Sequence, residues 1–214
     1  NMKKETILIT GGAGFIGSHV VGKLLHKGRR VVVIDNMNNY YNPEWKRENI
    51  KPYFEQKNFK MYEGDITEQE YIEEIIKKEE VKTIIHLAAR AGVRPSIQDP
   101  ILYERVNVGG SGVVLEVARK CKVKNVILAS SSSVYGNQKK TPFSEDDPVD
   151  HPISPYAATK RAMELLAYTY HYLFGLNIVC LRFFTVYGER GRSDMAPYIF
   201  TEKIIKGEEI QRFG

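Results

Sequence analysis

Apolar residues gather along this chain in short runs of strand length, and stretches with helical spacing lie between most of these runs. The runs are rich in Ile, Val and Leu and occur at residues 7–9, 30–34, 59–62, 83–87, 123–129 and 176–181. Helical patterns occupy residues 15–25, 67–78, 101–120 and 155–174, and a shorter helical piece lies near residues 43–53. Because a helix between two parallel strands must cover one face of their sheet, this alternation predicts an α/β fold with a doubly wound parallel sheet.

The most informative stretch, TGGAGFIG at residues 10–17, connects the first strand to the first helix. Its glycines fit the templates G-x-x-G-x-x-G and G-x-G-x-x-G, which bind a dinucleotide when they stand between a strand and a helix. Glycine allows a tight turn and lets a pyrophosphate approach the helix N-terminus, where unpaired N–H groups attract an anion. An ordinary strand–helix turn is the alternative explanation of the glycines alone.

An acidic residue at the end of the second strand supports the dinucleotide. Asp35 follows Gly17 by eighteen residues, a spacing typical of a carboxylate that binds the ribose hydroxyls. No basic residue follows directly in Asn36 and Met37, and a carboxylate repels a 2′-phosphate, so we expect NAD rather than NADP. Residues 1–182 are therefore predicted to form a Rossmann-type NAD-binding domain.

Composition narrows the class of protein. Of 214 residues, 43% are hydrophobic and 27% charged, as in a soluble globular protein. No apolar run reaches the roughly 18 residues that cross a bilayer, and no signal peptide precedes the first strand, so we expect no membrane contact. Cys121 and Cys180 lie in apolar segments without metal-ligand spacing, which predicts buried thiols, no metal and a cytoplasmic location. The net charge of +5 is modest and mixed with acids, which indicates a small anionic ligand rather than nucleic acid.

A tyrosine and a lysine four residues apart provide candidate chemistry. Tyr156 and Lys160, in YAATK, lie on one face of a helix that follows a polar loop leaving the sheet. The same spacing at residues 53 and 57 and at residues 135 and 139 falls in irregular segments. The pKa of a free tyrosine is about 10, so a phenolate that accepts a sugar hydroxyl proton needs a nearby ammonium and a bound nicotinamide cation. A solvated helix face is the alternative.

Polar groups at the ends of two other strands are further candidates. The hydroxyls of residues 130–133 follow the fifth strand and are suited to orient both a reacting hydroxyl and the phenol, although a flexible serine turn is the alternative. His86 lies inside an apolar strand, so we expect a hydrogen-bonded core histidine rather than a catalytic one.

Together, TGGAGFIG, Asp35, SSSSVYG, YAATK and LRFFTVYG resemble the extended short-chain dehydrogenase/reductase family, specifically its NAD-dependent sugar-nucleotide epimerases and dehydratases. The resemblance covers the whole chain. It implies that Ser131, Tyr156 and Lys160 are catalytic. It also implies a set of NAD-binding residues, which are Gly11, Gly12, Gly14, Phe15, Ile16, Gly17, Asp35, Asn36, Asp65, Ile66, Leu87, Ala88, Ala89, Tyr156, Lys160 and Phe184.

The two positions after Ser131 separate the reactions of this family. The 4,6-dehydratases carry an Asp-Glu pair there, and nucleotide-sugar decarboxylases usually carry Glu at the second position. This chain has Ser132 and Ser133, which cannot do that acid–base work. The resemblance therefore favours an epimerase, which oxidises C4, lets the ketone rotate and returns the hydride to the other face.

A second set of motifs narrows the substrate. RAGVRPSI at residues 90–97 and FFTVYGERGRSDMA at residues 183–196 look most like the UDP-glucuronate 4-epimerases, which implies a UDP-sugar substrate and conversion of UDP-glucuronate to UDP-galacturonate. UDP-glucose 4-epimerases more usually carry Asn at the position of Thr185. The candidate donors to a substrate carboxylate are Arg94, Ser132, Ser133, Thr185 and Arg192.

Three alternatives stay open at this stage. Arg94 and Arg192 are equally consistent with surface or phosphate-binding residues. The substrate is alternatively UDP-glucose or UDP-N-acetylglucosamine. A non-catalytic NAD-binding sensor or scaffold is a third possibility, although such a protein has no need of the Ser131, Tyr156 and Lys160 set.

The resemblance also predicts how the chain ends and assembles. Family members run further than Gly214, so residues 183–214 are expected to be the start of a smaller substrate-binding domain, with a first helix at residues 195–206. A preparation that ends at Gly214 is expected to bind NAD but to turn over weakly or not at all. Many relatives form dimers through a four-helix bundle, for which residues 101–120 and 155–174 are the candidate helices.

Overall fold

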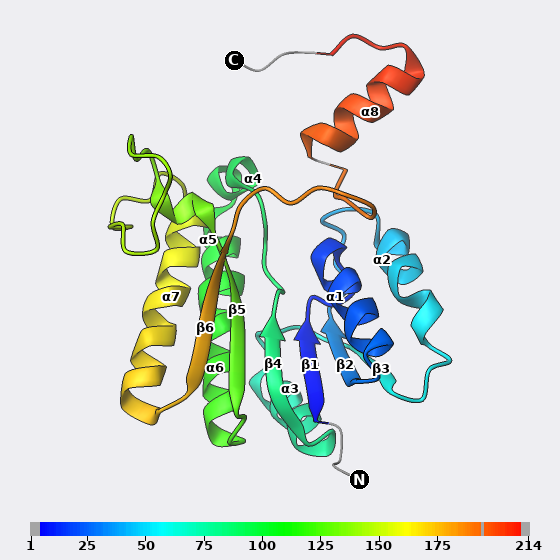
Figure 1. Ribbon diagram of the computed structural model, residues 1–214, viewed down its shortest axis with the longest axis vertical. Helices are drawn as coiled ribbons and strands as arrows, with labels where there is room; N and C mark the ends of the chain where they lie inside the picture. Colours follow the sequence, from blue (N-terminus) through cyan, green and yellow to red (C-terminus); the bar gives the residue numbers. More distant parts are fainter. Residues whose placement is uncertain (1–4, 194, 211–214) are drawn as a thin grey trace.

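A computed structural model of the protein describes residues 5–193 and 195–210, and its centre is a six-stranded sheet (Figure 1). The strands are β1 (Thr6–Thr10), β2 (Arg30–Asp35), β3 (Phe59–Glu63), β4 (Val81–His86), β5 (Asn125–Ser131) and β6 (Asn177–Phe183). They stand in the order β3-β2-β1-β4-β5-β6, and each neighbouring pair is parallel. This order confirms the predicted doubly wound sheet, and it reverses between β1 and β4, where such sheets bind ligands.

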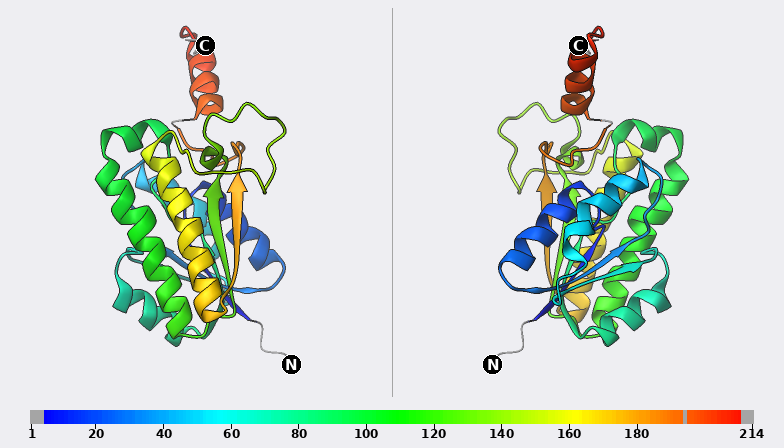
Figure 2. Two further views of the ribbon diagram at one scale, coloured as in Figure 1. Left: turned by 90° about the vertical axis from the view of Figure 1, so that its left-hand side faces the viewer. Right: turned by 90° about the vertical axis from the view of Figure 1, so that its right-hand side faces the viewer.

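Helices cover both faces of the sheet (Figures 1 and 2). α1 (Phe15–His26) and α2 (Pro43–Ile50), which η1 (Lys51–Tyr53) extends, pack on one face against β1 to β3. α3 (Gln69–Lys78), α6 (Gly110–Lys120) and α7 (Pro155–Phe174) pack on the opposite face. In residues 5–193 and 195–210, none of the helices combines the length and apolar character needed to span a membrane.

Each face of the sheet has its own apolar core. Val31 and Val33 of β2 pack with residues of α1 and α2, whereas Val32 and Ile34 pack with residues of α3, α6 and α7. This alternation follows from the strand geometry, in which successive side chains point to opposite faces. Because helices lie on both faces of β2, this strand is apolar and buried at each position from Val31 to Ile34, and such apolar runs located the strands in the sequence.

The helical region at residues 90–120 differs from the prediction. Residues outside every predicted helix form α4 (Val93–Gln98). The single helix expected at residues 101–120 is divided into α5 (Pro100–Tyr103), a π-helical turn η2 (Glu104–Gly109) and α6. Within η2, the buried Asn107 amide accepts from the Arg90 N–H at 2.7 Å and donates to the Arg90 carbonyl at 3.0 Å. Asn107 thus pairs with the chain that leaves β4, and a π-turn of this kind is typical near functional sites.

A turn organised by Asp65, rather than a side-chain cap, precedes α3. The N-cap residue of α3 is Glu68, and its side chain accepts no cap hydrogen bond. The hydroxyl and N–H of Thr67 donate instead to Asp65 Oδ1, at 2.7 and 2.9 Å. Asp65 therefore organises this turn, because a short acidic side chain can bind the backbone two residues ahead.

The segment that follows β6 crosses the carboxyl edge of the sheet (Figure 1). β6 continues to Phe183, beyond the predicted end of the strand, and an irregular segment then leads to α8 (Ala196–Lys206), which matches the predicted helix. α8 stands beyond the carboxyl edge of the sheet (Figures 1 and 2), with Tyr198 packed at 5.8 Å from the Trp45 ring of α2. The division into domains at residues 182 and 183 stays a prediction.

The two cysteines are less buried than predicted. Both are free thiols and both are half-buried, since Cys121 ends α6 and Cys180 lies on the edge strand β6. Burial nevertheless raises the pKa of each thiol, to about 11 for Cys180. Neither cysteine therefore carries a thiolate at neutral pH.

Candidate active site

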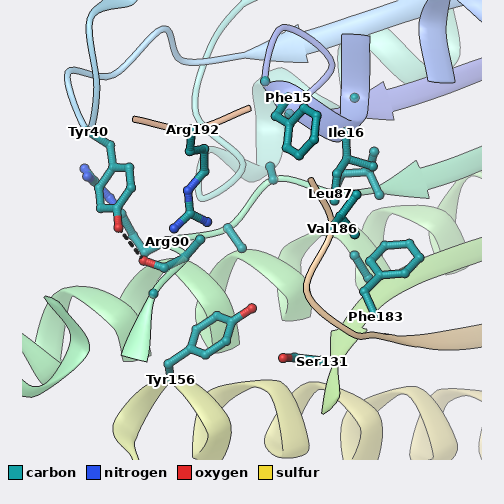
Figure 3. A pocket seen from close by; sticks show the side chains of 18 of the residues that line it. Phe15, Ile16, Tyr40, Leu87, Arg90, Ser131, Tyr156, Phe183, Val186 and Arg192 are labelled. Carbon is teal, nitrogen blue, oxygen red and sulfur yellow. Dashed lines mark hydrogen bonds between the residues drawn. The ribbon is translucent and has the colours of Figure 1, made fainter. Parts of the chain in front are cut away.

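A cavity of about 420 Å³ opens at the carboxyl edge of the sheet. Its walls come from the glycine turn, the ends of β2, β4 and β5, the start of α7 and the segment after β6 (Figure 3). Most of the predicted site residues line it, and they are Gly11, Gly14, Phe15, Ile16, Gly17, Asp35, Asn36, Ile66, Leu87, Ala88, Ala89, Ser131, Ser132, Ser133, Tyr156, Lys160, Phe184, Thr185 and Arg192. The fold therefore brings together residues that are far apart in the sequence.

Three predicted site residues lie outside this lining. A Cβ on Gly12 would lie 2.6 Å from Val33 Cγ2, so Gly12 faces the core rather than the cavity. Asp65 lies behind Asn36, whose Nδ2 donates to its carboxylate at 2.7 Å. Arg94 is exposed on α4. Asp65 therefore supports Asn36 in the cavity wall, while the cofactor-binding roles of Gly12 and Asp65 and a substrate-binding role of Arg94 stay predictions.

Close approach of the backbone explains the glycines of the turn. Gly11 has a φ of +69°, and a Cβ there would lie 2.7 Å from the backbone N of Ala88. A Cβ on Gly17 would lie 2.2 Å from the Gly11 carbonyl oxygen. α1 begins after Gly14, and among its described residues there is no side-chain cap and no acidic residue in the first turn. The backbone N–H groups of this first turn are therefore available to an anion in the cavity. This end of the cavity fits a pyrophosphate.

Asp35 is held at the end of β2 by backbone donors and by a lysine that the sequence did not suggest. Its carboxylate accepts from Ala13 N at 3.2 Å and from Met37 N at 3.0 Å, and Lys46 Nζ lies 3.4 Å away. Asp35 and Lys46 are 6% and 5% exposed, and both line the cavity. The carboxylate is suited to bind ribose hydroxyls. The preference for NAD over NADP rests on the absence of a basic residue next to Asp35 in the sequence, but the fold places the Lys46 ammonium beside it.

α7 delivers Tyr156 and Lys160 to the end of β5, and Ser154 caps the helix just before them. Lys160 Nζ donates to the Ala129 carbonyl at 2.7 Å and lies 5.9 Å from the centre of the Tyr156 ring. Ser131 lies close enough to Tyr156 to lower the pKa of its phenol. The three residues predicted to be catalytic thus meet within one wall of the cavity.

Burial dominates the pKa values of these groups. Lys160 is 4% exposed, and burial lowers its pKa to about 8. Burial raises the pKa of Tyr156, while the Ser131 hydrogen bond and the charge of Arg192 oppose that rise. Figure 3 shows Arg192 and Tyr156 reaching toward each other from opposite sides of the cavity. The charge of Arg192, which the sequence reasoning did not connect with the phenol, therefore acts on Tyr156 in addition to the nearby Lys160 ammonium.

Ser131 also starts the turn that carries the neighbouring serines. Its Oγ accepts from Ser133 N at 3.1 Å and donates to Ser133 Oγ at 3.1 Å, which caps η3 (Ser132–Tyr135). Ser132, Ser133 and Thr185, each of which carries a hydroxyl, also line the cavity. This wall is therefore rich in neutral hydrogen-bond donors.

His86 is a core histidine, as predicted. Its Nδ1 is 2.7 Å from Thr10 Oγ1 and its Nε2 is 3.1 Å from Ser111 Oγ. Burial lowers its pKa to about 3, and the nearby charge of Lys160 acts in the same direction. His86 is therefore neutral at physiological pH and both ring nitrogens are satisfied within the core.

Two tyrosines on the cavity side of β4 escaped the sequence reasoning. The hydroxyls of Tyr40 and Tyr103 both donate to the Ala91 carbonyl, at 2.8 and 2.5 Å. Tyr103 meets the Tyr156 ring edge-on with centroids 6.4 Å apart, and the Arg192 guanidinium lies 5.6 Å from the Tyr40 ring. Among 13 tyrosines, no local pattern distinguished these two, because their common partner lies on a distant loop.

Known proteins are similar to this chain in sequence and in fold. The profile of the NAD dependent epimerase/dehydratase family matches residues 7–214. An uncharacterized protein of Methanocaldococcus jannaschii is 46% identical over 100% of this chain and 66% of its own length. The UDP-glucuronate 4-epimerase of Thermodesulfobacterium geofontis is 44% identical over 97% of this chain and 64% of its own length. UDP-glucuronate 4-epimerase 4 of Arabidopsis thaliana is also 44% identical, and the chain spans 48% of it.

Solved structures agree with these relatives. The UDP-glucuronic acid 4-epimerase of Bacillus cereus, in complex with UDP-glucuronic acid and NAD, matches with a TM-score of 0.91 and 36% identity over 98% of this chain and 66% of its own. The UDP-glucose 4-epimerase of Thermotoga maritima, with UDP-glucose, matches with a TM-score of 0.88 and 38% identity over the same shares. The matches confirm the family resemblance, the fold and the NAD dependence of the group. The chain belongs to the NAD dependent epimerase/dehydratase family.

Proposed function

We propose that the protein carrying this chain catalyses NAD-dependent C4 epimerisation of a nucleotide sugar through a 4-keto intermediate. The observation that carries the proposal is the meeting of Ser131, Tyr156 and Lys160 in one cavity with the glycine turn and Asp35. When bound, NAD supplies the hydride acceptor and donor that such a reaction needs. The glycine turn is suited to its pyrophosphate and Asp35 to its ribose, as the close backbone approach and the buried carboxylate indicate.

Proton transfer to and from the sugar hydroxyl is assigned to one residue of the site, and its neighbours orient the hydroxyl and supply charge. Tyr156 takes the proton of the sugar hydroxyl and returns it, and Ser131, whose interaction with Tyr156 lowers the pKa of the phenol, orients that hydroxyl. Because burial raises the pKa of Tyr156, the phenol needs positive charge close by before it can serve as a base at neutral pH. Arg192 supplies part of this charge, and Lys160 holds the cofactor ribose near the phenol.

We further propose UDP-glucuronate as the substrate and UDP-galacturonate as the product. The cavity wall offers Ser132, Ser133, Thr185 and Arg192 as donors to a sugar carboxylate. The 4-keto form of a uronic acid is a β-keto acid, which loses carbon dioxide readily. Fixing the carboxylate in an orientation that disfavours this loss would protect the intermediate.

The test incubates the whole protein with UDP-glucuronate and, separately, with UDP-glucose, and resolves the C4 epimers by NMR. We expect UDP-galacturonate from the first and little product from the second. Product from UDP-glucose alone would favour the alternative UDP-hexose epimerase, for which the Thermotoga maritima structure is the supporting likeness. NAD binding without product from either sugar would favour a sensor or scaffold. A Tyr156→Phe variant is the control for background conversion.

A second substitution series tests the carboxylate clamp. Ser132→Ala and Thr185→Val remove one hydroxyl each from the cavity wall. We expect both variants to release a larger share of decarboxylated product, because the carboxylate loses a fixed donor. Unchanged product purity in both variants would count against the clamp.

We also propose that the protein is a homodimer. Leu165, Tyr168 and Tyr172 lie on one face of α7 and are exposed, up to 75% for Tyr172. Ile101 of the neighbouring α5 is exposed as well. An exposed apolar patch of this kind typically marks a contact with another protein, and the family resemblance points to a second copy. The predicted cytoplasmic location stays a prediction.

A further inference from the structure

A buried ion pair lies behind the cavity and joins α7 to β6. Arg182 Nε donates to Glu164 Oε1 at 3.0 Å, and its second terminal nitrogen donates to Glu164 Oε2 at 3.1 Å. The two side chains are 6% exposed for Glu164 and 19% for Arg182. Such a two-bond fork fixes both groups in orientation as well as in distance. Neither residue belongs to the cavity lining, so neither is placed to touch a ligand there.

The ion pair reaches both ends of the serine turn. Ser130, directly before Ser131, donates its hydroxyl to Glu164 Oε1 at 2.6 Å. At the other end, Arg182 donates to the Tyr135 hydroxyl at 3.1 Å, and its guanidinium lies 5.0 Å from the centre of the Tyr135 ring. Tyr135 is the last residue of η3. One charged pair thus bonds to Ser130, the first of the four serines that line the cavity, and to Tyr135, two residues after the last of them.

Glu164 also extends a pattern that begins with the predicted catalytic residues. Tyr156, Lys160 and Glu164 are spaced by four residues and occupy one face of α7. Each faces a different residue in the stretch 129–131 of β5. Lys160 donates to the Ala129 carbonyl, Glu164 accepts from Ser130, and Ser131 lies close enough to Tyr156 to lower its pKa. Three successive turns of the helix therefore lie against three successive residues of the strand, and two of them are hydrogen-bonded to it.

Arg161 offers a natural comparison within the same cluster. It donates to Glu164 Oε2 at 3.1 Å, but its other contact is Asp150, at 3.5 Å, and not the serine turn. Arg161 therefore shares the charge environment of Glu164 without a bond to either end of the turn. A substitution there disturbs the ion cluster but leaves the anchors at Ser130 and Tyr135 in place.

We propose that Glu164 and Arg182 are positioning residues of the site, which hold the Ser131 hydroxyl against Tyr156 through their bonds to Ser130 and Tyr135. The physical reason is that a short run of serines has little apolar side chain to pack, so its geometry depends on anchors at its ends. A displacement of about 1 Å at a reacting group can cost about a hundredfold in rate. The effect on turnover rests on the proposed function, whereas the effect on the turn does not.

The first experiment measures the turn itself by hydrogen–deuterium exchange. The Ser133 amide, which donates to Ser131 Oγ, reports whether the turn is intact. Arg182→Lys keeps a charge without the fork, and Tyr135→Phe removes one hydroxyl while keeping the ring that stacks on Phe143. We expect both to speed exchange at residues 131–135 by about tenfold, with no change in β1, while Arg161→Met leaves the turn as in the wild type. Equal exchange in all four proteins would overturn the proposal.

The second experiment measures turnover of UDP-glucuronate as a function of pH. We expect Arg182→Lys and Tyr135→Phe to lower kcat by about tenfold or more with a small change in KM. The acidic limb of the kcat profile should move to higher pH, because a weaker Ser131 bond lets burial raise the pKa of Tyr156 further. A loss of folded protein alone would lower activity without moving this limb. An unmoved limb would contradict the positioning role.

The two failures can be told apart. If the wild-type protein epimerises no UDP-sugar, the proposed function is wrong, and the exchange experiment still decides whether the ion pair positions the turn. If the wild type is active and Arg182→Lys matches it in exchange, kcat and pH profile, the positioning role is wrong while the proposed function stands. Arg161→Met, which keeps both anchors, should match the wild type in every measurement.

Discussion

The buried charge of Lys160 should destabilise the folded protein, and a Lys160→Met variant should reveal this in the pH dependence of the free energy of unfolding. Burial lowers the Lys160 pKa from 10.5 to about 8. The shift of about 2.5 units corresponds to about 3 kcal/mol against the charged form at neutral pH, at about 1.4 kcal/mol per unit. Methionine fills a similar volume without a charge, but it leaves the Ala129 carbonyl without the 2.7 Å bond from Lys160, at a cost of about 1–3 kcal/mol.

The two effects nearly cancel at pH 7, so the decisive quantity is the change with pH. The folded-state pKa of Lys160 lies below the unfolded value, so unfolding takes up a proton between about pH 8 and pH 10.5. Wild-type stability therefore rises with pH across that window, and the methionine variant lacks this contribution. From pH 7 to pH 9.5, the difference in unfolding free energy should move by about 2 kcal/mol in favour of the wild type.

Urea unfolding followed by circular dichroism at pH 7 and pH 9.5 measures this difference. Other titrating groups are common to both proteins and cancel when the variant is subtracted from the wild type. Lys139→Met is the control, because Lys139 is exposed in the loop after η3 and should give the same difference at both pH values. If the gap between the wild type and Lys160→Met is constant from pH 7 to pH 9.5, the reasoning is refuted. The variant should also lose turnover.

Three further predictions concern the cofactor end and the assembly. Lys46→Met leaves Asp35 unopposed, so calorimetry should show NADP affinity falling about tenfold more than NAD affinity, and an unchanged ratio would contradict this. Gly17→Ala should abolish NAD binding because its Cβ meets the backbone at 2.2 Å, whereas Gly112→Ala, with nothing within 4 Å, should bind as the wild type does. Normal NAD binding by Gly17→Ala would disprove that account. Tyr172→Glu should convert a dimer to a monomer in sedimentation, and a monomeric wild type would exclude the proposed dimer.

The sheet and the glycine turn could be predicted because their signals are local. A parallel strand covered on both faces must be apolar along its length, so Val31 to Ile34 stand out from their neighbours without any knowledge of the fold. Gly11 and Gly17 are required by contacts within the same strand–turn–helix unit and with the adjacent strand. Local constraint also explains why Tyr156 and Lys160 could be identified, since they share one helix face.

The residues that were missed depend on contacts between distant segments. Lys46 meets Asp35 only because α2 folds back over the end of β2, and nothing in its own helix marks it. Asn107 breaks a helix that periodicity predicts to be continuous, because its side chain binds the backbone at Arg90. Likewise, the charge of Arg192 lowers the pKa of Tyr156 only because the segment after β6 folds back over the cavity. Such facts follow from the folded arrangement and carry no periodic signal.

The face of α7 toward β5 carries three titratable groups, Tyr156, Lys160 and Glu164. The surroundings favour the neutral form of the first two and the charged form of the third. Burial raises the pKa of Tyr156 and lowers that of Lys160, so both are biased toward their neutral forms. Burial also acts to raise the pKa of Glu164, but hydrogen bonds from Arg182 and Ser130 outweigh it and keep the carboxylate ionised. The charges of Glu164 and Arg182 neutralise each other. The pair therefore positions the serine turn but adds little electrostatic potential at the Tyr156 phenol. Positive charge reaches Tyr156 instead from Arg192, across the cavity, and from Lys160, one turn along α7, so the ion pair and the cavity side of the site have separable roles.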